Sequence, residues 1–134
     1  VMRIQREDRG AISILHLSGN MTGGPAHDQF EQAIDELIGE ERHWLVLDFE
    51  KVSFMASPAI GFVVRFYARF VRSGGEVVSS RISRRIALPY DLFLRRLIEC
   101  YESIDRAVVV LEQRRRETAK NAPAEAEAAE RAEA

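Results

Sequence analysis

The chain has 134 residues, of which 46% are hydrophobic and 30% charged, and these values fit one small globular domain. Its 19 basic and 21 acidic residues give a net charge of -2, which argues against a nucleic-acid binder, because such proteins gain most of their affinity by neutralising phosphates. The single cysteine, Cys100, excludes an intrachain disulfide, and no apolar run reaches the roughly 20 residues of a membrane-spanning helix. The first residues lack the apolar core of a signal peptide, so we expect a soluble cytoplasmic domain without direct membrane insertion.

The first half of the chain alternates between strand and helix patterns. Residues 2–6 and 11–17 flank a polar turn and predict a hairpin. A glycine-rich loop over residues 19–24 leads into a predicted helix. Apolar residues recur along one face of that helix at positions Phe30, Ile34, Leu37 and Ile38. Residues 44–49 form a short apolar run, which predicts a strand buried on both faces, as in a parallel sheet.

The second half continues the alternation. A helix is predicted over residues 58–72, ahead of two glycines, and a strand over 76–80. Residues 81–97 have a helical pattern that Pro89 should break, because proline cannot occupy a helix interior without a kink. Residues 98–101 predict a short strand. Ser103 then caps a last helix with an apolar face made of Ile104, Ala107, Val108 and Leu111. This order predicts an α/β fold with a largely parallel sheet covered by helices.

The composition changes after residue 111. Residues 112–134 hold eight Ala, five basic and six acidic residues, and no larger apolar side chain. Because such a segment has little to bury, we expect a domain over residues 1–111, followed by a helical extension or a disordered tail over residues 112–134.

The sequence carries no pattern of catalytic or metal-binding residues. The histidines, His16, His27 and His43, are scattered and lack metal-ligand spacing, and Cys100 has no adjacent basic residue to activate its thiol. Asp48 ends a central strand, where α/β proteins often place functional groups, but no second carboxylate or base matches it. We therefore predict no enzymatic activity, no metal and no cofactor.

Residues 46–61 read Val-Leu-Asp-Phe-Glu-Lys-Val-Ser-Phe-Met-Ala-Ser-Pro-Ala-Ile-Gly and resemble the signature of the STAS domain. This family includes the bacterial anti-sigma factor antagonists. Its signature is an apolar strand, then Asp-(Leu/Phe)-x-x-Val-x-(Phe/Tyr)-(Ile/Met)-Asp-Ser-Ser/Thr-Gly-(Leu/Ile)-Gly, then a helix. Residues 17–21, 74–78 and 101–107 also resemble family segments, in the expected order. The resemblance spans residues 3–111.

The resemblance implies a small mixed β-sheet with parallel central strands and helices packed mainly on one side. In the antagonists, an anti-sigma factor kinase phosphorylates a Ser or Thr at the start of the second helix. The unphosphorylated antagonist binds that anti-sigma factor and frees the sigma factor, and a phosphatase resets the switch. The implied partners are therefore an anti-sigma factor that is a serine kinase and a phosphatase, while the oligomeric state is left open.

The sequence departs from the family pattern at the phosphorylation site. Ala56 stands where the motif has Asp, and Ser57 matches the first hydroxyl residue. Pro58 occupies the usual phosphoacceptor position, Ala59 replaces the following Gly, and Thr22 lies where many relatives have Asp in the first loop. Phosphorylation at the usual position is chemically impossible, because Pro58 has no hydroxyl.

Proline suits the first position of a helix, and the residue before it favours the extended conformation of an N-cap. We therefore predict that Ser57 caps the second helix and that Pro58 is its first residue. The alternative hypothesis is that Ser57 is itself phosphorylated, aided by the positive end of the helix dipole.

Helical spacing divides the second helix into faces. The pattern predicts a buried stripe of Ile60, Val63, Val64, Tyr67 and Val71, and a solvated face of Arg65, Arg69 and Arg72. Phe62 is expected to be largely exposed and Phe66 partly exposed, unless the last helix or the tail covers them. Together with the family motif, these residues predict a partner-binding surface of Asn20, Met21, Thr22, Ala56, Ser57, Pro58, Ala59, Phe62 and Phe66.

Three functions follow as hypotheses. The first is a non-catalytic regulatory module that binds proteins like an anti-sigma factor antagonist, with an altered switch. The second keeps the fold as a scaffold or structural subunit of a signalling or membrane transport complex. The third is a small-ligand binder that uses the loop over residues 19–24.

Overall fold

The computed structural model describes the backbone of residues 1–133 and the side-chain environment of residues 1–120. The elements in chain order are β1 (Arg3–Arg9), β2 (Ile12–Met21), α1 (Pro25–Gly39), β3 (Trp44–Met55), α2 (Ser57–Arg72), β4 (Glu76–Ser80), α3 (Ala87–Phe93), β5 (Cys100–Tyr101) and α4 (Ile104–Glu133). The strands form one sheet in the order β1-β2-β3-β4-β5. Strand β1 is antiparallel to β2, and the other neighbours are parallel. The predicted α/β class with parallel central strands is confirmed.

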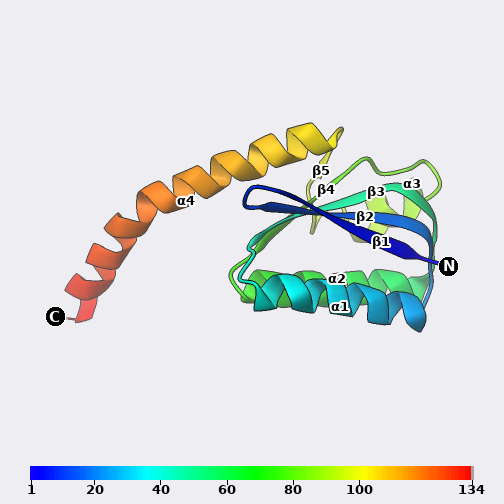
Figure 1. The fold of residues 1–134 in the computed structure, drawn as a ribbon, viewed down its shortest axis with the longest axis horizontal. Helices are drawn as coiled ribbons and strands as arrows, with labels where there is room; N and C mark the ends of the chain where they lie inside the picture. The colour runs from blue at the N-terminus through cyan, green and yellow to red at the C-terminus, as the bar shows by residue number, and fades with distance from the viewer. Residues whose placement is uncertain (134) are drawn as a thin grey trace.

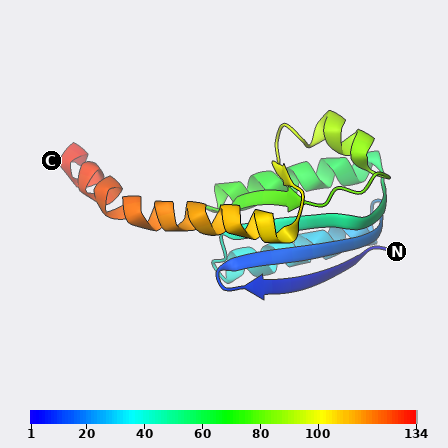
Figure 2. The same cartoon turned by 90° about the horizontal axis from the view of Figure 1, so that it is seen from above.

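Helices α1 and α2 lie side by side on one face of the sheet, and α4 begins on the other (Figure 1). Figure 2 shows α4 passing over β4 and β3 before it leaves the sheet. The alternating side chains of β3 supply both cores, as the apolar run predicts: Leu45 and Leu47 pack toward α1 and α2, and Val46 toward α4. The smaller core under α4 consists of Ile12, Ile14, Val46, Val78, Ile104, Ala107 and Leu111. The larger core also takes in Tyr90 of α3, so the helices pack mainly on one side.

The segment over residues 81–97 shows how proline limits a helix. Only Ala87–Phe93 is helical, and Pro89 lies in the first turn, where a missing N–H breaks no helical hydrogen bond. Tyr90 anchors this short helix: its ring is buried against Phe49, with 5.8 Å between ring centroids, and its hydroxyl donates to the Ile98 carbonyl at 2.7 Å. The predicted cap of the last helix is confirmed, because the Ser103 hydroxyl accepts the Arg106 N–H at 3.0 Å.

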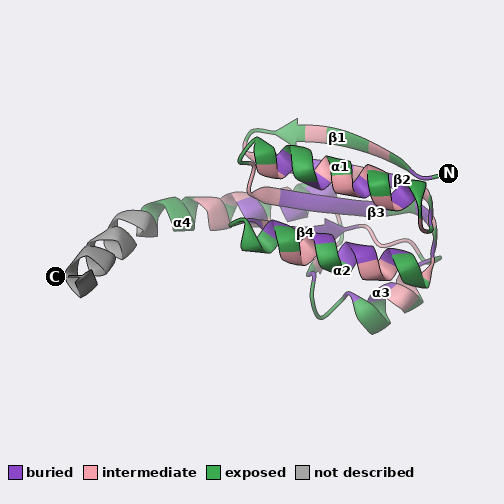
Figure 3. Cartoon of the chain, turned by 90° about the horizontal axis from the view of Figure 1, so that it is seen from below, coloured by how far each residue is buried: buried purple, intermediate pink, exposed green. Residues whose placement is uncertain are grey.

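The predicted exposure of Phe62 and Phe66 is wrong. Both side chains are buried, at 1% and 5% relative exposure, while Val64 and Val71 of the predicted buried stripe are 37% and 40% exposed. The reason is that α2 packs against α1 as well as against the sheet. Phe30 of α1 lies 5.8 Å from the Phe62 ring and 5.7 Å from the Phe66 ring, so the buried face includes the aromatic flank (Figure 3).

We expect Phe62→Ala to lower the free energy of unfolding by about 3–5 kcal/mol, because it removes a fully buried ring and leaves a cavity between α1 and α2. Val64→Ala, two residues along the same helix but on its solvent side, should cost less than about 1 kcal/mol. Urea denaturation of the two variants measures both values. Equal, small losses would show that the Phe62 ring is not part of the core.

Candidate partner-binding site

Strands β2 and β3 end side by side and bring two segments of the predicted site together. Met21 pairs with Met55 in register, and the Ala56 N–H donates to the Met21 carbonyl at 2.9 Å. The loop that follows β2 therefore lies beside the start of α2. On this end of the domain Asn20, Thr22, Ser57 and Pro58 are exposed, Ala56 is half-buried, and Met21 and Ala59 are fully buried beneath them.

The first residue of α2 differs from the prediction. Ala56, not Ser57, is the N-cap: its backbone is extended, with φ -79° and ψ 160°, and its carbonyl accepts the N–H groups of Ala59 and Ile60. Pairing with Met21 holds Ala56 as a continuation of the strand, so the helix begins at the next residue. No side chain caps this end. The Ser57 hydroxyl is therefore left exposed to solvent rather than used as a cap.

The glycines before α1 are explained by backbone geometry. Gly19 has φ +90°, and a Cβ at this position would collide with the carbonyl oxygen of Val1. Gly24 has φ +57° and is the N-cap of α1, directly before Pro25. Both positions require glycine whether or not a ligand binds to this loop.

Large apolar side chains are exposed at the same end of the domain. Helix α3 turns Tyr90 inward, which leaves Leu88, Leu92 and Phe93 at 70%, 65% and 59% exposure. Phe54, close to the end of β3, is 52% exposed. Helix α3 lies beside the first half of α2 (Figures 2 and 3). The loop before α3 is joined to β3 by the Ser83 hydroxyl, which donates to the Val52 carbonyl at 2.8 Å.

We call this region the strand-end surface and define it as Asn20, Thr22, Phe54, Ser57, Pro58, Leu88, Leu92 and Phe93. The prediction included the polar part and missed the apolar part. The sequence signal for the missed part is the pair Leu88 and Leu92, one helical turn apart, on either side of Tyr90. Phe62 and Phe66, which the prediction placed on this surface, lie in the core instead.

Asp48 has partners that the sequence did not predict. The strand register places it opposite His16, and the loop after β4 brings Arg81 to the same point. His16 Nδ1 lies 2.7 Å from Asp48 Oδ2, and the Arg81 guanidinium donates to the same oxygen at 2.7 Å. His16 Nε2 lies 2.9 Å from Glu7 Oε1. Because both ring nitrogens face carboxylates, His16 has no free nitrogen to act as a base.

The charge state of Asp48 follows from these contacts. Burial opposes ionisation of this carboxyl, but hydrogen bonds from Arg81, His16 and the Glu50 amide outweigh it and hold the Asp48 pKa below its usual range. A lowered pKa in the folded state stabilises the protein above the unfolded pKa of about 3.9, and this contribution is lost as the pH falls through the folded value.

We expect Arg81→Ala to lower the free energy of unfolding by about 1–3 kcal/mol near pH 7, because Asp48 loses one of its charged donors. The difference from wild type should shrink as the pH falls below about 4, where a protonated Asp48 no longer attracts Arg81. Urea denaturation between about pH 3 and 7 measures it. Arg96→Ala, an exposed arginine, is the control, and a loss that is the same at both ends of the range would assign Arg81 a packing role instead.

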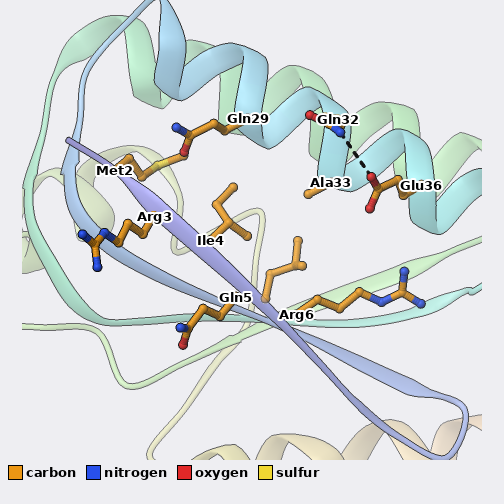
Figure 4. Close-up of a pocket in the computed structure, with 10 residues that line it drawn as sticks. Met2, Arg3, Ile4, Gln5, Arg6, Gln29, Gln32, Ala33 and Glu36 are labelled. Atoms are coloured by element: carbon orange, nitrogen blue, oxygen red, sulfur yellow. Dashed lines mark hydrogen bonds between the residues drawn. The ribbon is translucent and has the colours of Figure 1, made fainter.

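A hollow of about 490 Å³ lies between β1 and α1. Met2 and Ile4 line it from the strand side, and Gln29, Gln32 and Glu36 line it from the helix (Figure 4). The Gln32 amide donates to the Glu36 carboxylate at 3.3 Å. No residue of the loop over 19–24 lines this hollow, so it gives the small-ligand hypothesis no support.

The described part of the chain has neither a membrane-spanning helix nor a cluster of metal ligands. None of its helices combines the length and the apolar character that crossing a membrane requires. No group of three or more His, Cys, Asp or Glu side chains among the described residues is placed to hold a metal ion.

Comparison with known proteins places this geometry in a family. The family model of the STAS domain matches residues 3–107. An anti-sigma factor antagonist from Mycobacterium paratuberculosis has the same fold, with a TM-score of 0.73 and 21% identity over 84% of this chain and 95% of that chain. The Bacillus cell fate determinant SpoIIAA in its phosphorylated form has a TM-score of 0.63 and 18% identity over 81% of this chain and 99% of that chain.

An RsbS variant from Moorella thermoacetica has a TM-score of 0.71 and 14% identity over 85% of this chain and 98% of that chain. A search of curated protein sequences gave no match. At these identities the solved structures establish the fold, and the family model, which covers most of the chain, establishes the family. This chain belongs to the STAS domain family.

Proposed function

We propose that this protein is a non-catalytic partner-switching module of the cytoplasm, which binds an anti-sigma factor through the strand-end surface and so takes part in transcription regulation. The observation that carries the proposal is the cluster of exposed apolar side chains beside the exposed start of α2. Leu88, Leu92 and Phe93 are each more than half exposed, although water disfavours contact with such groups. Large exposed apolar groups gathered on one surface are typical of protein interaction sites.

The surface combines the two kinds of contact that a protein partner uses. The apolar side chains of α3 and Phe54 offer area to bury, and the polar groups of Asn20, Thr22 and Ser57 offer hydrogen bonds around it. The partner class comes from the family: solved structures of the same fold include anti-sigma factor antagonists, one of them in a phosphorylated form.

We further propose that the protein binds its partner without phosphorylation at position 58. Pro58 supplies neither a hydroxyl nor an N–H, and it is the second residue of α2, so it removes one of the donors that would hold a phosphate at this helix end. Ser57 is exposed and remains the one hydroxyl at the start of α2.

For partner binding, we expect the double variant Leu88→Ala and Leu92→Ala to weaken binding by about tenfold or more, because both side chains lose their apolar contact area. Stability should change by less than about 1 kcal/mol, since both residues are exposed. Pull-down from a lysate of the source organism, followed by mass spectrometry, should recover a kinase-fold anti-sigma factor with the wild type and not with the variant.

Val109→Ala provides the matched control, because Val109 is 55% exposed but lies on α4. It should recover the partner as the wild type does. Recovery of transporter components instead would support the alternative role as a subunit of a membrane transport complex. Equal recovery by the double variant and the wild type would show that the strand-end surface is not the binding site.

For phosphorylation, we expect no phosphate on the wild type after incubation with the recovered kinase and ATP, measured by intact mass spectrometry. Pro58→Ser restores a hydroxyl at the family position and should gain one phosphate, while Ser57→Ala in that background should keep it. A phosphate on Ser57 of the wild type would contradict this expectation and support a switch displaced by one residue.

A further inference from the structure

The face of the sheet that carries α4 is covered over only part of its area. The covered part is apolar and includes Ile14 and Val46 under the first turns of α4. Farther along the same strands the face becomes polar, and a pocket of about 450 Å³ opens there, lined by side chains of β1, β2, β3 and the loop after β4. No residue that lines this pocket belongs to the strand-end surface, and the proposed partner binding does not use the pocket.

The strand register places the polar side chains on one face. Arg3 pairs with Ser18 and Gln5 with His16 between β1 and β2, and directly paired residues point to the same side of a sheet. Between β2 and β3, His16 pairs with Asp48, but Ser18 pairs with Lys51.

A bulge in β3 is what brings Lys51 to this pocket. His16 and Ser18 are two residues apart, whereas their partners Asp48 and Lys51 are three apart, so β3 carries one extra residue at this point. In a regular strand the side chains of positions 48 and 51 would point to opposite faces. The bulge instead lets the Lys51 ammonium line the same pocket as Asp48.

The carboxylate that lines the pocket, Asp48, is already engaged by other side chains. Asp48 is 4% exposed, and its oxygens accept hydrogen bonds from Arg81 and face His16. Arg81 also pairs with Glu50 at 2.6 Å, so its charge is shared between two carboxylates. Asp48, His16, Arg81 and Glu50 thus form one network of hydrogen bonds and ion pairs.

Two positive charges remain at the rim. Among the described residues, no carboxylate lies within 4.0 Å of the Arg3 guanidinium or of the Lys51 ammonium. The Gln5 amide and the Ser18 hydroxyl also line the pocket. Arg and Lys are donors only, and Gln and Ser can donate. A ligand that pairs with the hydrogen-bond donors of these four side chains must be rich in acceptors and carry negative charge.

We propose that this pocket binds a phosphate group, as the free dianion or as a small phosphate monoester. The two rim cations match the charge of a phosphate dianion, and a tetrahedral phosphate has enough oxygens to accept from Arg3, Lys51 and the neighbouring polar groups at once. A volume of about 450 Å³ also accommodates the small organic part of a monoester.

The test is isothermal titration calorimetry of the full chain with inorganic phosphate and with glycerol 3-phosphate, at constant ionic strength. We expect saturable binding at one site. Lys51→Ala and Arg3→Ala should each weaken it by about tenfold, because each removes a charged hydrogen-bond donor. Arg72→Ala, which removes the same charge from the exposed side of α2, is the control and should change the affinity by less than about twofold.

The probes separate the two sources of phosphate. Equal affinities for both indicate that the free anion is the ligand, and tighter binding of glycerol 3-phosphate indicates a monoester. The proposal is overturned if neither probe binds saturably, if Arg72→Ala weakens binding as much as Lys51→Ala, or if malonate, a planar-ended dicarboxylate, binds as tightly as phosphate.

Discussion

Strand β3 is the constraint on which the rest of the structure depends. Its first half is buried on both faces, it pairs in parallel with β2 and β4, and its alternating side chains enter both cores. Its pairing with β4 ends at Asp48, but its pairing with β2 continues to Met55, so the chain stays in the sheet up to that residue. The Ala56 N–H, still paired with Met21, fixes where α2 begins. The position of the strand-end surface is thus a consequence of where β3 stops.

The same strand contributes residues to both proposed binding sites. At its carboxyl end lies Phe54 of the strand-end surface, and the Arg85 guanidinium donates to the neighbouring Ser53 hydroxyl at 3.3 Å. On the face that carries α4, the middle of the strand holds Asp48, and the bulge after it adds Lys51. The charged groups of the proposed anion site, Arg3, Lys51 and the Asp48 network, are not among the residues of the strand-end surface. The two proposals can be tested separately because the residues that carry them do not overlap.

Local patterns in the sequence predicted the elements, while side-chain partners required the strand register. The helix over 58–72 follows from its apolar spacing and the two glycines after it, the strand over 76–80 comes directly after those glycines, and the structure agrees closely. The buried face of α2 could not be placed, because a helix packed on both a sheet and a second helix buries two flanks, and the sequence does not say where α1 lies. The contact between His16 and Asp48 joins residues 32 apart and depends on how β2 aligns with β3.

Strand β1 has a consequence for how this protein can associate. It is one edge of the sheet, and Arg6 bridges to Asp8 at 3.0 Å while Arg9 bridges to Glu7 at 2.6 Å, so charges of both signs line the open edge. At the opposite edge, β5 has two residues, Cys100 and Tyr101, too few to guide an incoming strand. An open edge with these features resists pairing with another chain. Edge-to-edge pairing of two sheets is therefore disfavoured, which protects the protein against aggregation. Other proteins are then recognised through side-chain surfaces.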